Sequence, residues 1–201
     1  CSFQNGSHRY YWHNSYSSNT TWPNSDLYKG LNGISGGLYS NLFIGNTSYM
    51  PSGWEDKIET TTWKYGDITN VDMTADAVYN TENAWGNTID AKIGLIYMYD
   101  YFYAYQSGGL NCSQSGSPDT CKTSWMHLSK CDSGAPFVHE WTMSRYGLSG
   151  GNCITWYVFV NGYVTNASPS NTLSVRPVFY LKSTVQFEGG TGTSTDPFII
   201  S

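Results

Sequence analysis

The sequence predicts an α+β fold in which short helices pack on twisted antiparallel sheets, with long loops and disulfides. A hairpin is indicated by ITWYVFVNGYVTN (154–166), because Asn161-Gly162 between two apolar runs accepts the positive φ angles of a tight turn. A short helix is indicated by TADAVYNTENAW (74–85), with Thr74 as its N-cap. Four cysteines cluster in a Ser- and Gly-rich region without C-x-x-C spacing, which favours disulfides over a zinc site.

The first thirty residues are expected to precede the folded domain. Residues 1–30 are rich in Ser, Asn, Tyr and Gly without a period, which predicts an extended or poorly ordered lead-in to a single domain over 31–201. Within that domain GGLYSNLFIG (36–45) has the apolar spacing of a short helix. The segment KIETTTWKYGD (57–67) alternates β-branched and aromatic residues and predicts a strand.

The segment KIGLIYMYDYFYAYQSGG (92–109) gathers aromatic residues around a single carboxylate. Ile93 and Leu95 alternate as a short strand, and Asp100 lies where a helix is expected to begin. Three residues then share one helix face and are expected in the core: Tyr101, Ala104 and Tyr105. For Tyr99 and Tyr103 two interpretations stay open, partial burial with the hydroxyl at the surface or a ligand platform. A membrane-surface helix is excluded, because the apolar stripe is short and has no basic flank.

After the hairpin, two further features are expected near the C-terminus. SVRPVFYLKSTVQF (174–187) predicts a strand or a pair of strands. GGTGTSTDP (189–197) is typical of a glycine-rich turn, and FIIS (198–201) is expected to form the closing strand.

Composition points to an extracellular protein. Charged residues make up 12% of the chain, about half the usual share, and the net charge of -5 comes without any Lys/Arg cluster. Nucleic acid and anionic membrane surfaces are therefore not expected as partners. No apolar run reaches the length of a membrane span, and the N-terminus lacks the features of a signal peptide. We expect an ectodomain at the cell surface, whose signal or anchor lies upstream of residue 1.

The clustered cysteines allow three pairings, of which Cys112–Cys121 with Cys131–Cys153 is favoured. The first bridge closes the loop SQSGSPDT, and the second ties the segment before HEWTMSR to the strand ITWYVFV. Cys1 is left over. It is the acylated cysteine of a lipoprotein, a partner for another chain, or only the residue at which this sequence begins.

The order of these motifs resembles C-type lectin-like domains. One segment of formylglycine-generating-enzyme-type domains runs through Leu-Pro, an acidic helix start, Tyr-Ala and Gly-Gly, and it is similar to IGLIYMYDYFYAYQSGG. The corresponding residues here are Leu95, Tyr101, Tyr103 and Ala104. SVRPVFYL resembles their closing strand, with Arg176 as its arginine. The whole order from 38 to 200 looks like a family of Gram-positive gut bacterial surface proteins, many of which carry a prepilin-type N-terminus. The resemblance implies a C-type lectin-like scaffold. For Arg176 the favoured role is structural, paired to a carboxylate or to backbone carbonyls.

Signals for catalysis and metal binding are weak. The reactive cysteine pair of the related enzymes and the Glu-Pro-Asn, Gln-Pro-Asp and Trp-Asn-Asp motifs of calcium-dependent lectins do not occur. His139-Glu140 begins like a zinc-protease helix, but Met143 stands where the second histidine belongs. For the segment between Glu188 and Asp196 there are two interpretations, a site in which both carboxylates bind a hard cation and a plain glycine-rich turn. The turn is favoured. We therefore expect no enzyme, no cofactor and no metal.

Binding is the function that the sequence favours. Tyr and Trp give large rigid contact areas, and Ser and Asn give adaptable hydrogen bonds. On C-type lectin-like scaffolds, including the variable proteins of diversity-generating retroelements, ligand-binding loops precede the closing strand. The candidate ligand-binding residues are Trp156, Tyr157, Asn161, Tyr163, Asn166, Ser168 and Asn171. The sequence predicts an adhesion module, displayed on a bacterial surface or pilus, that recognises a protein or glycan. The alternatives are a pilin-like filament subunit that contacts other pilin subunits and, more remotely, a formylglycine-generating-type enzyme.

Overall fold

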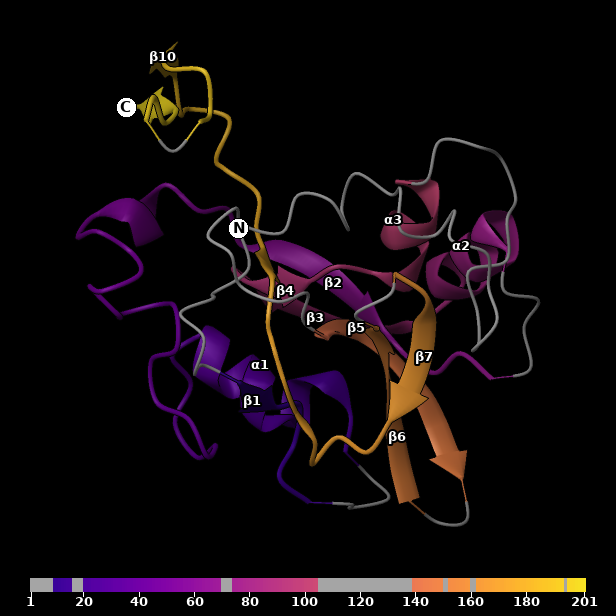
Figure 1. The fold of residues 1–201 in the computed structure, drawn as a ribbon. Coiled ribbons are helices and arrows are strands. Elements are labelled where there is room, and N and C mark those ends of the chain that lie inside the picture. Colours follow the sequence, from indigo (N-terminus) through magenta and orange to yellow (C-terminus); the bar gives the residue numbers. More distant parts are fainter. Residues whose placement is uncertain are drawn as a thin grey trace.

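The structure, a computed structural model, describes residues 9–15, 20–69, 74–104, 139–149, 152–159, 162–193 and 195–201. It confirms a mixed α+β architecture of short helices and small antiparallel sheets (Figure 1). The helices are η1 (Trp22–Asn24), α1 (Asp26–Leu31), η2 (Trp54–Asp56), α2 (Ala75–Asn83) and α3 (Met98–Tyr103). The strands are β1 (Tyr10–Tyr11), β2 (Thr61–Tyr65), β3 (Asn87–Ala91), β4 (Gly94–Leu95), β5 (Glu140–Ser149), β6 (Asn152–Val158), β7 (Val164–Ala167), β8 (Thr172–Leu173), β9 (Pro177–Val178), β10 (Phe187–Gly189) and β11 (Ile199–Ile200).

The antiparallel sheet β5–β6–β7 lies between two hydrophobic clusters. Side chains alternate across a strand, so successive residues of β5 and β6 face opposite clusters. Trp141 and Met143 belong to the first cluster, whereas Trp156 and Val158 belong to the second. Both faces of this sheet are therefore committed to packing over much of their area.

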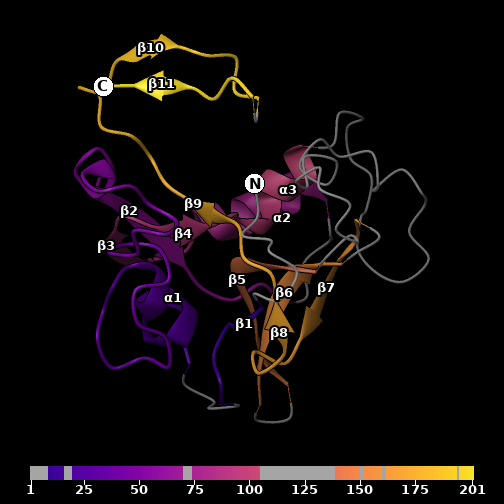
Figure 2. The ribbon, with the colours of Figure 1, turned by 60° about the vertical axis from the view of Figure 1, so that its left-hand side comes forward.

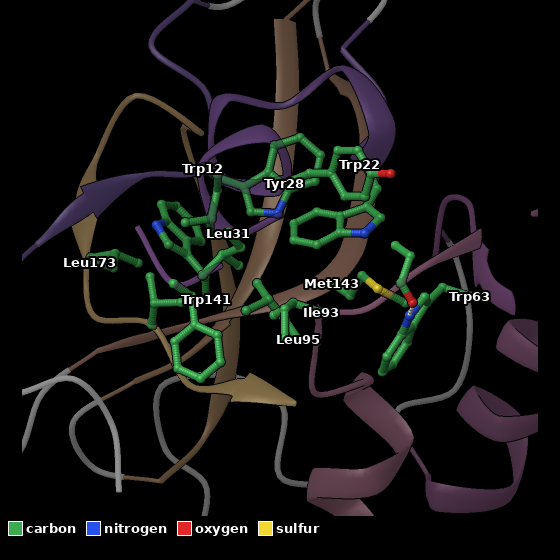
Figure 3. Packing of buried hydrophobic residues seen from close by; sticks show 14 of the residues in the cluster. Trp12, Trp22, Tyr28, Leu31, Trp63, Ile93, Leu95, Trp141, Met143 and Leu173 are labelled. Atoms are coloured by element: carbon green, nitrogen blue, oxygen red, sulfur yellow. Dashed lines mark hydrogen bonds between the residues drawn. The ribbon is translucent and has the colours of Figure 1, made fainter. Parts of the chain in front are cut away.

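The first cluster recruits the N-terminal segment. Trp12 and Trp22 are buried beside Tyr28 and Leu31 of α1 (Figure 3). The indole N–H of Trp141 donates to the Tyr10 carbonyl at 2.8 Å, which fixes this segment to β5. The expected lead-in over residues 1–30 is therefore corrected for its described part: residues 9–15 and 20–30 help to build the core, because their tryptophans find partners far along the chain.

The second cluster holds α2 and α3 against the opposite face of the sheet. Val78 of α2 and Met98, Tyr101 and Phe102 of α3 are buried there. The Tyr101 hydroxyl donates to the Gly162 carbonyl at 2.7 Å, which joins α3 to the β6–β7 hairpin. The expected core positions Leu95, Tyr101 and Ala104 are confirmed by exposures of 0%, 2% and 6%, and Tyr105 lies outside the described residues.

The remaining strands form two-stranded ribbons, several of which join distant parts of the chain. β2 pairs with β3, and Trp63 lies opposite Ile89. β4 pairs with β9, and β1 pairs with β8. The C-terminal pair β10–β11 stands apart from the body in Figure 2. The expected strands at 57–67, 174–187 and 198–201 are each confirmed in part of their range.

Local hydrogen bonds confirm one helix prediction and shift another. The Thr74 side chain accepts the Ala77 N–H at 3.4 Å, so Thr74 is the N-cap of α2 as expected. α3 begins earlier than expected, since Tyr97 is its N-cap. Asp100 lies three residues inside and accepts the Tyr97 N–H at 3.2 Å. A carboxylate at this position satisfies a backbone donor that the helix itself leaves unpaired.

Two predictions of local structure are wrong in detail. Residues 36–45 form bends and turns instead of a helix, and Asn41 has a φ of 54°, which a right-handed helix does not admit. In the hairpin, the Gly162 N–H donates to the Phe159 carbonyl, and the Phe159 N–H donates to the Tyr163 carbonyl, both at 2.8 Å. The connection is thus one residue longer than a two-residue turn, and Gly162 supplies its positive φ of 84°. Asn161 lies outside the described residues.

The structure does not show the expected Cys131–Cys153 bridge. The thiol of Cys153 is free and buried, and it donates to the Thr20 carbonyl at 3.7 Å. The other four cysteines lie outside the described residues. Arg176 has the expected structural role, because its Nη2 lies 3.0 Å from the carboxylate of buried Glu140. Over the described part of the chain, no helix has the length and apolar character needed to cross a membrane.

Candidate binding surfaces

The hairpin residues predicted to bind a ligand divide into core and surface. Trp156 is 7% exposed, and its indole N–H donates to the Ile68 carbonyl at 3.2 Å. Its expected role in ligand binding is therefore corrected to a role in the core. Tyr157, on the other face of β6, is half-buried and contacts the rings of Trp141 and His139 edge-on.

Beyond the hairpin turn, the predicted residues are more accessible. Tyr163 stacks on Phe159 with ring centroids 4.5 Å apart. Asn166 and Asn171 are exposed, as expected. The Ser168 hydroxyl accepts the Ser170 N–H at 3.1 Å, so it stabilises a turn. These residues lie on or beside β7 and its following loop, and none of them lines the pocket around Arg145 or the pocket beside Asn32.

A second surface is formed by four tyrosines of α2, α3 and the residue that precedes α3. We call Tyr79, Tyr97, Tyr99 and Tyr103 the tyrosine surface. The rings of Tyr97 and Tyr99 stack at 5.4 Å with an interplanar angle of 14°. Tyr79 meets the ring of Tyr99 edge-on at 5.2 Å and that of Tyr103 at 6.2 Å. The four rings thus form one continuous aromatic layer.

This layer is both anchored and accessible. The Tyr97 hydroxyl donates to the Lys64 carbonyl and accepts the Lys64 N–H, each at 2.9 Å. The Tyr103 hydroxyl donates to Asp76 at 2.6 Å. Tyr79 and Tyr103 are nevertheless 39% and 51% exposed. Such rings lose little conformational entropy on binding, because their neighbours already restrict them. Of the two interpretations of Tyr99 and Tyr103, partial burial fits Tyr99, whereas Tyr103 is too exposed for it; the ligand platform stays a prediction.

A buried carboxylate stabilises the start of α3, which carries part of the tyrosine surface. Glu82 of α2 accepts the N–H groups of Met98 and Tyr99 at 3.1 and 2.9 Å, and it also accepts the Ser144 hydroxyl. It therefore satisfies two donors at the start of α3 that have no partner within that helix. Burial raises the pKa of Glu82 to about 7, while these hydrogen bonds oppose the rise.

A pocket of about 200 Å³ opens where four segments of the chain meet. Its residues come from the start of η1, the end of β2 and the two residues after it, the start of β3 with Trp85 before it, and β5. We call it the aromatic pocket; its lining residues are Thr21, Trp22, Tyr65, Gly66, Asp67, Trp85, Asn87, Met143 and Arg145. A Cβ on Gly66 would lie 2.6 Å from the Trp85 ring, so only glycine permits this close contact.

The charged wall of the aromatic pocket is an ion pair. The Arg145 guanidinium donates two hydrogen bonds to the Asp67 carboxylate, one of them at 2.8 Å through Nη2. Its Nη1 donates to the Thr20 carbonyl at 2.9 Å. The Trp85 indole N–H donates to the Asp67 carbonyl at 3.1 Å, which fixes that ring. The pair joins residues that are 78 positions apart.

The described residues contain no cluster of side chains suited to hold a metal ion. Asp196 accepts the Thr191 N–H at 3.0 Å, so it stabilises the glycine-rich turn. Glu188 is exposed.

Sequence reasoning missed the aromatic pocket altogether. Asp67 and Arg145 carry no local signal, since each is an isolated charge in a strand-like context. Trp22 belonged to the expected lead-in. For the tyrosine surface, the sequence offered a ligand platform as one of two interpretations of Tyr99 and Tyr103, but no local pattern placed Tyr79 of the predicted helix 74–85 beside them.

In comparisons with known proteins, no family model, no curated protein and no solved structure matches this chain. The candidate surfaces above are therefore described from their geometry alone.

Proposed function

We propose that this chain is an extracellular binding module, with a C-type lectin-like scaffold, that holds a protein or glycan ligand for adhesion at a bacterial surface. The observation that carries the proposal is the tyrosine surface, four ring-packed tyrosines of which Tyr79 and Tyr103 stay well exposed. Exposed tyrosines that are already held in place give contact area at little entropic cost, and they commonly dominate interface energies. We place the ligand-binding site on α2 and α3 instead of on the hairpin, because Trp156 of the hairpin belongs to the core.

The test compares two surfaces of the same protein. The double variant Tyr79→Ser/Tyr103→Ser should lose binding by more than about tenfold on whole cells or on glycan and protein arrays, since hot-spot residues contribute about 2 kcal/mol or more. Its unfolding midpoint should change little, because the two side chains are largely exposed.

The comparison variant is Tyr163→Ala/Asn166→Ala/Asn171→Ala, which changes the predicted hairpin surface. Loss of binding in this triple variant alone would return the ligand site to the hairpin. Unchanged binding in both folded variants would contradict an adhesion function for either surface.

The C-terminal hairpin favours a second candidate function, that of a pilin-like subunit in a larger assembly. Phe187, Phe198 and Ile199 are 63%, 61% and 54% exposed. The two phenylalanine rings contact only one another among the ring contacts of the described residues, at 5.6 Å. An isolated two-stranded hairpin is marginally stable alone, so contact with another chain would stabilise it. Light scattering of the wild type and of Phe187→Ser/Phe198→Ser tests this, since a subunit contact predicts self-association that the variant abolishes.

A further inference from the structure

We propose that the aromatic pocket binds one neutral sugar ring, stacked against its aromatic walls and hydrogen-bonded by Asp67 and Asn87. This site is separate from the tyrosine surface, and it does not depend on that surface being a binding site. Three properties of the pocket lead to this ligand: its size, its charge and an unsatisfied donor in its wall.

The size of the aromatic pocket selects a single ring. A cavity of about 150 Å³ holds one benzene molecule in an apolar protein interior. The aromatic pocket measures about 200 Å³ and is only partly enclosed, which suits a six-membered ring with its substituents. The rings of Trp22, Tyr65 and Trp85 supply apolar faces, and the C–H groups of a sugar ring pack against such faces.

The charge of the pocket selects a neutral ligand. Asp67 and Arg145 neutralise one another, so an anion would meet the carboxylate and a cation would meet the guanidinium. Asp67 keeps acceptor capacity on a side chain that is 37% exposed. Arg145 makes one bond through each terminal nitrogen, and each of these nitrogens carries a second N–H. Hydroxyl groups both donate and accept, which matches an acceptor and a donor held side by side.

One donor in the pocket wall has no partner. The indole Nε1 of Trp22 is buried and makes no hydrogen bond in the described part of the chain. Figure 3 shows this nitrogen on the side of the ring that faces Met143, which also lines the pocket. Buried donors of this kind are uncommon, and they point to an acceptor that is absent from the protein itself. A ring oxygen or hydroxyl of the sugar would be that acceptor.

The test uses the whole chain and methyl glycosides of glucose, galactose, mannose and N-acetylglucosamine. Saturation-transfer NMR and tryptophan fluorescence report binding, since Trp22 and Trp85 line the pocket. At least one glycoside should bind with a Kd of about 1 mM or lower. Asn87→Ala and Trp22→Phe should each weaken it at least about fivefold, because one removes an exposed amide that lines the pocket and the other removes the unpaired N–H.

Matched controls separate binding from folding and from the tyrosine surface. Asn80→Ala makes the same change at an exposed position on α2 and should leave binding unchanged. Tyr79→Ser/Tyr103→Ser should also leave glycoside binding unchanged. The absence of binding by every glycoside, binding that both Asn87→Ala and Trp22→Phe leave unaltered, or tighter binding of choline than of any glycoside would each overturn the proposal. The result for Trp22→Phe is interpreted only if urea unfolding shows that this variant is folded. If it is not folded, the result for Asn87→Ala decides the test.

Discussion

Replacing Glu82 with alanine should destabilise the protein by removing the shared acceptor of α2, α3 and β5. The variant leaves the buried N–H of Met98 and the partly buried N–H of Tyr99 without a partner, because both donate to Glu82 in the wild type. Each such orphan costs about 1–3 kcal/mol, so the two together cost ~2–6 kcal/mol. Relief from burying the carboxylate offsets part of this cost, which places the expected loss near the lower half of that range.

Urea unfolding at pH 5, well below the raised pKa of Glu82 and followed by circular dichroism, measures this loss. For a chain of this size the slope is about 2–3 kcal/mol/M, so the midpoint should fall by ~1 M with an unchanged slope. Glu82→Gln keeps one oxygen acceptor in the same volume and should lose about half as much. Glu59→Ala is the matched control, since Glu59 is exposed, and it should change stability by no more than about 0.5 kcal/mol. If Glu82→Ala unfolds at the same urea concentration as Glu59→Ala, the capping role assigned to Glu82 is wrong.

Two further predictions concern ionisation and the buried thiol. Burial raises the pKa of Glu82 from 4.5 to about 7, so its contribution to the free energy of unfolding is fully present below pH 4.5 and is lost as the pH rises through about 7. The difference in unfolding free energy between wild type and Glu82→Gln should therefore shrink or reverse across that window. A constant difference would contradict the shifted pKa. Cys153 is 0% exposed and burial raises its pKa, so a thiol reagent should label it only after unfolding. Rapid labelling of the native protein, or a Cys131–Cys153 bridge found by non-reducing peptide mapping, would show that the assignment of Cys153 as a free, buried thiol is wrong.

The sequence determined the elements whose signals are local. The Thr74 cap, the alternation along β2 and the glycine of the β6–β7 hairpin each act within a few residues, so the residue types alone were enough to place them. The core positions Leu95, Tyr101 and Ala104 followed in the same way from strand and helix periodicity. Where a local signal was ambiguous, as in 36–45, the predicted helix was wrong, because glycines and a positive φ at Asn41 favour turns there.

Tertiary structure alone decided which faces are core and where ligands have access. Alternation places Trp156 and Tyr157 on opposite faces of β6, but only the packing of α3 on one face made Trp156 a core residue. The aromatic pocket needs Trp22, Asp67 and Arg145 together, and the tyrosine surface needs α2 beside α3. These contacts join residues that are far apart in the chain, and their energy depends on distances that no local pattern encodes. The sequence therefore specified aromatic and polar side chains suited to binding, while the fold determined which of them share a surface.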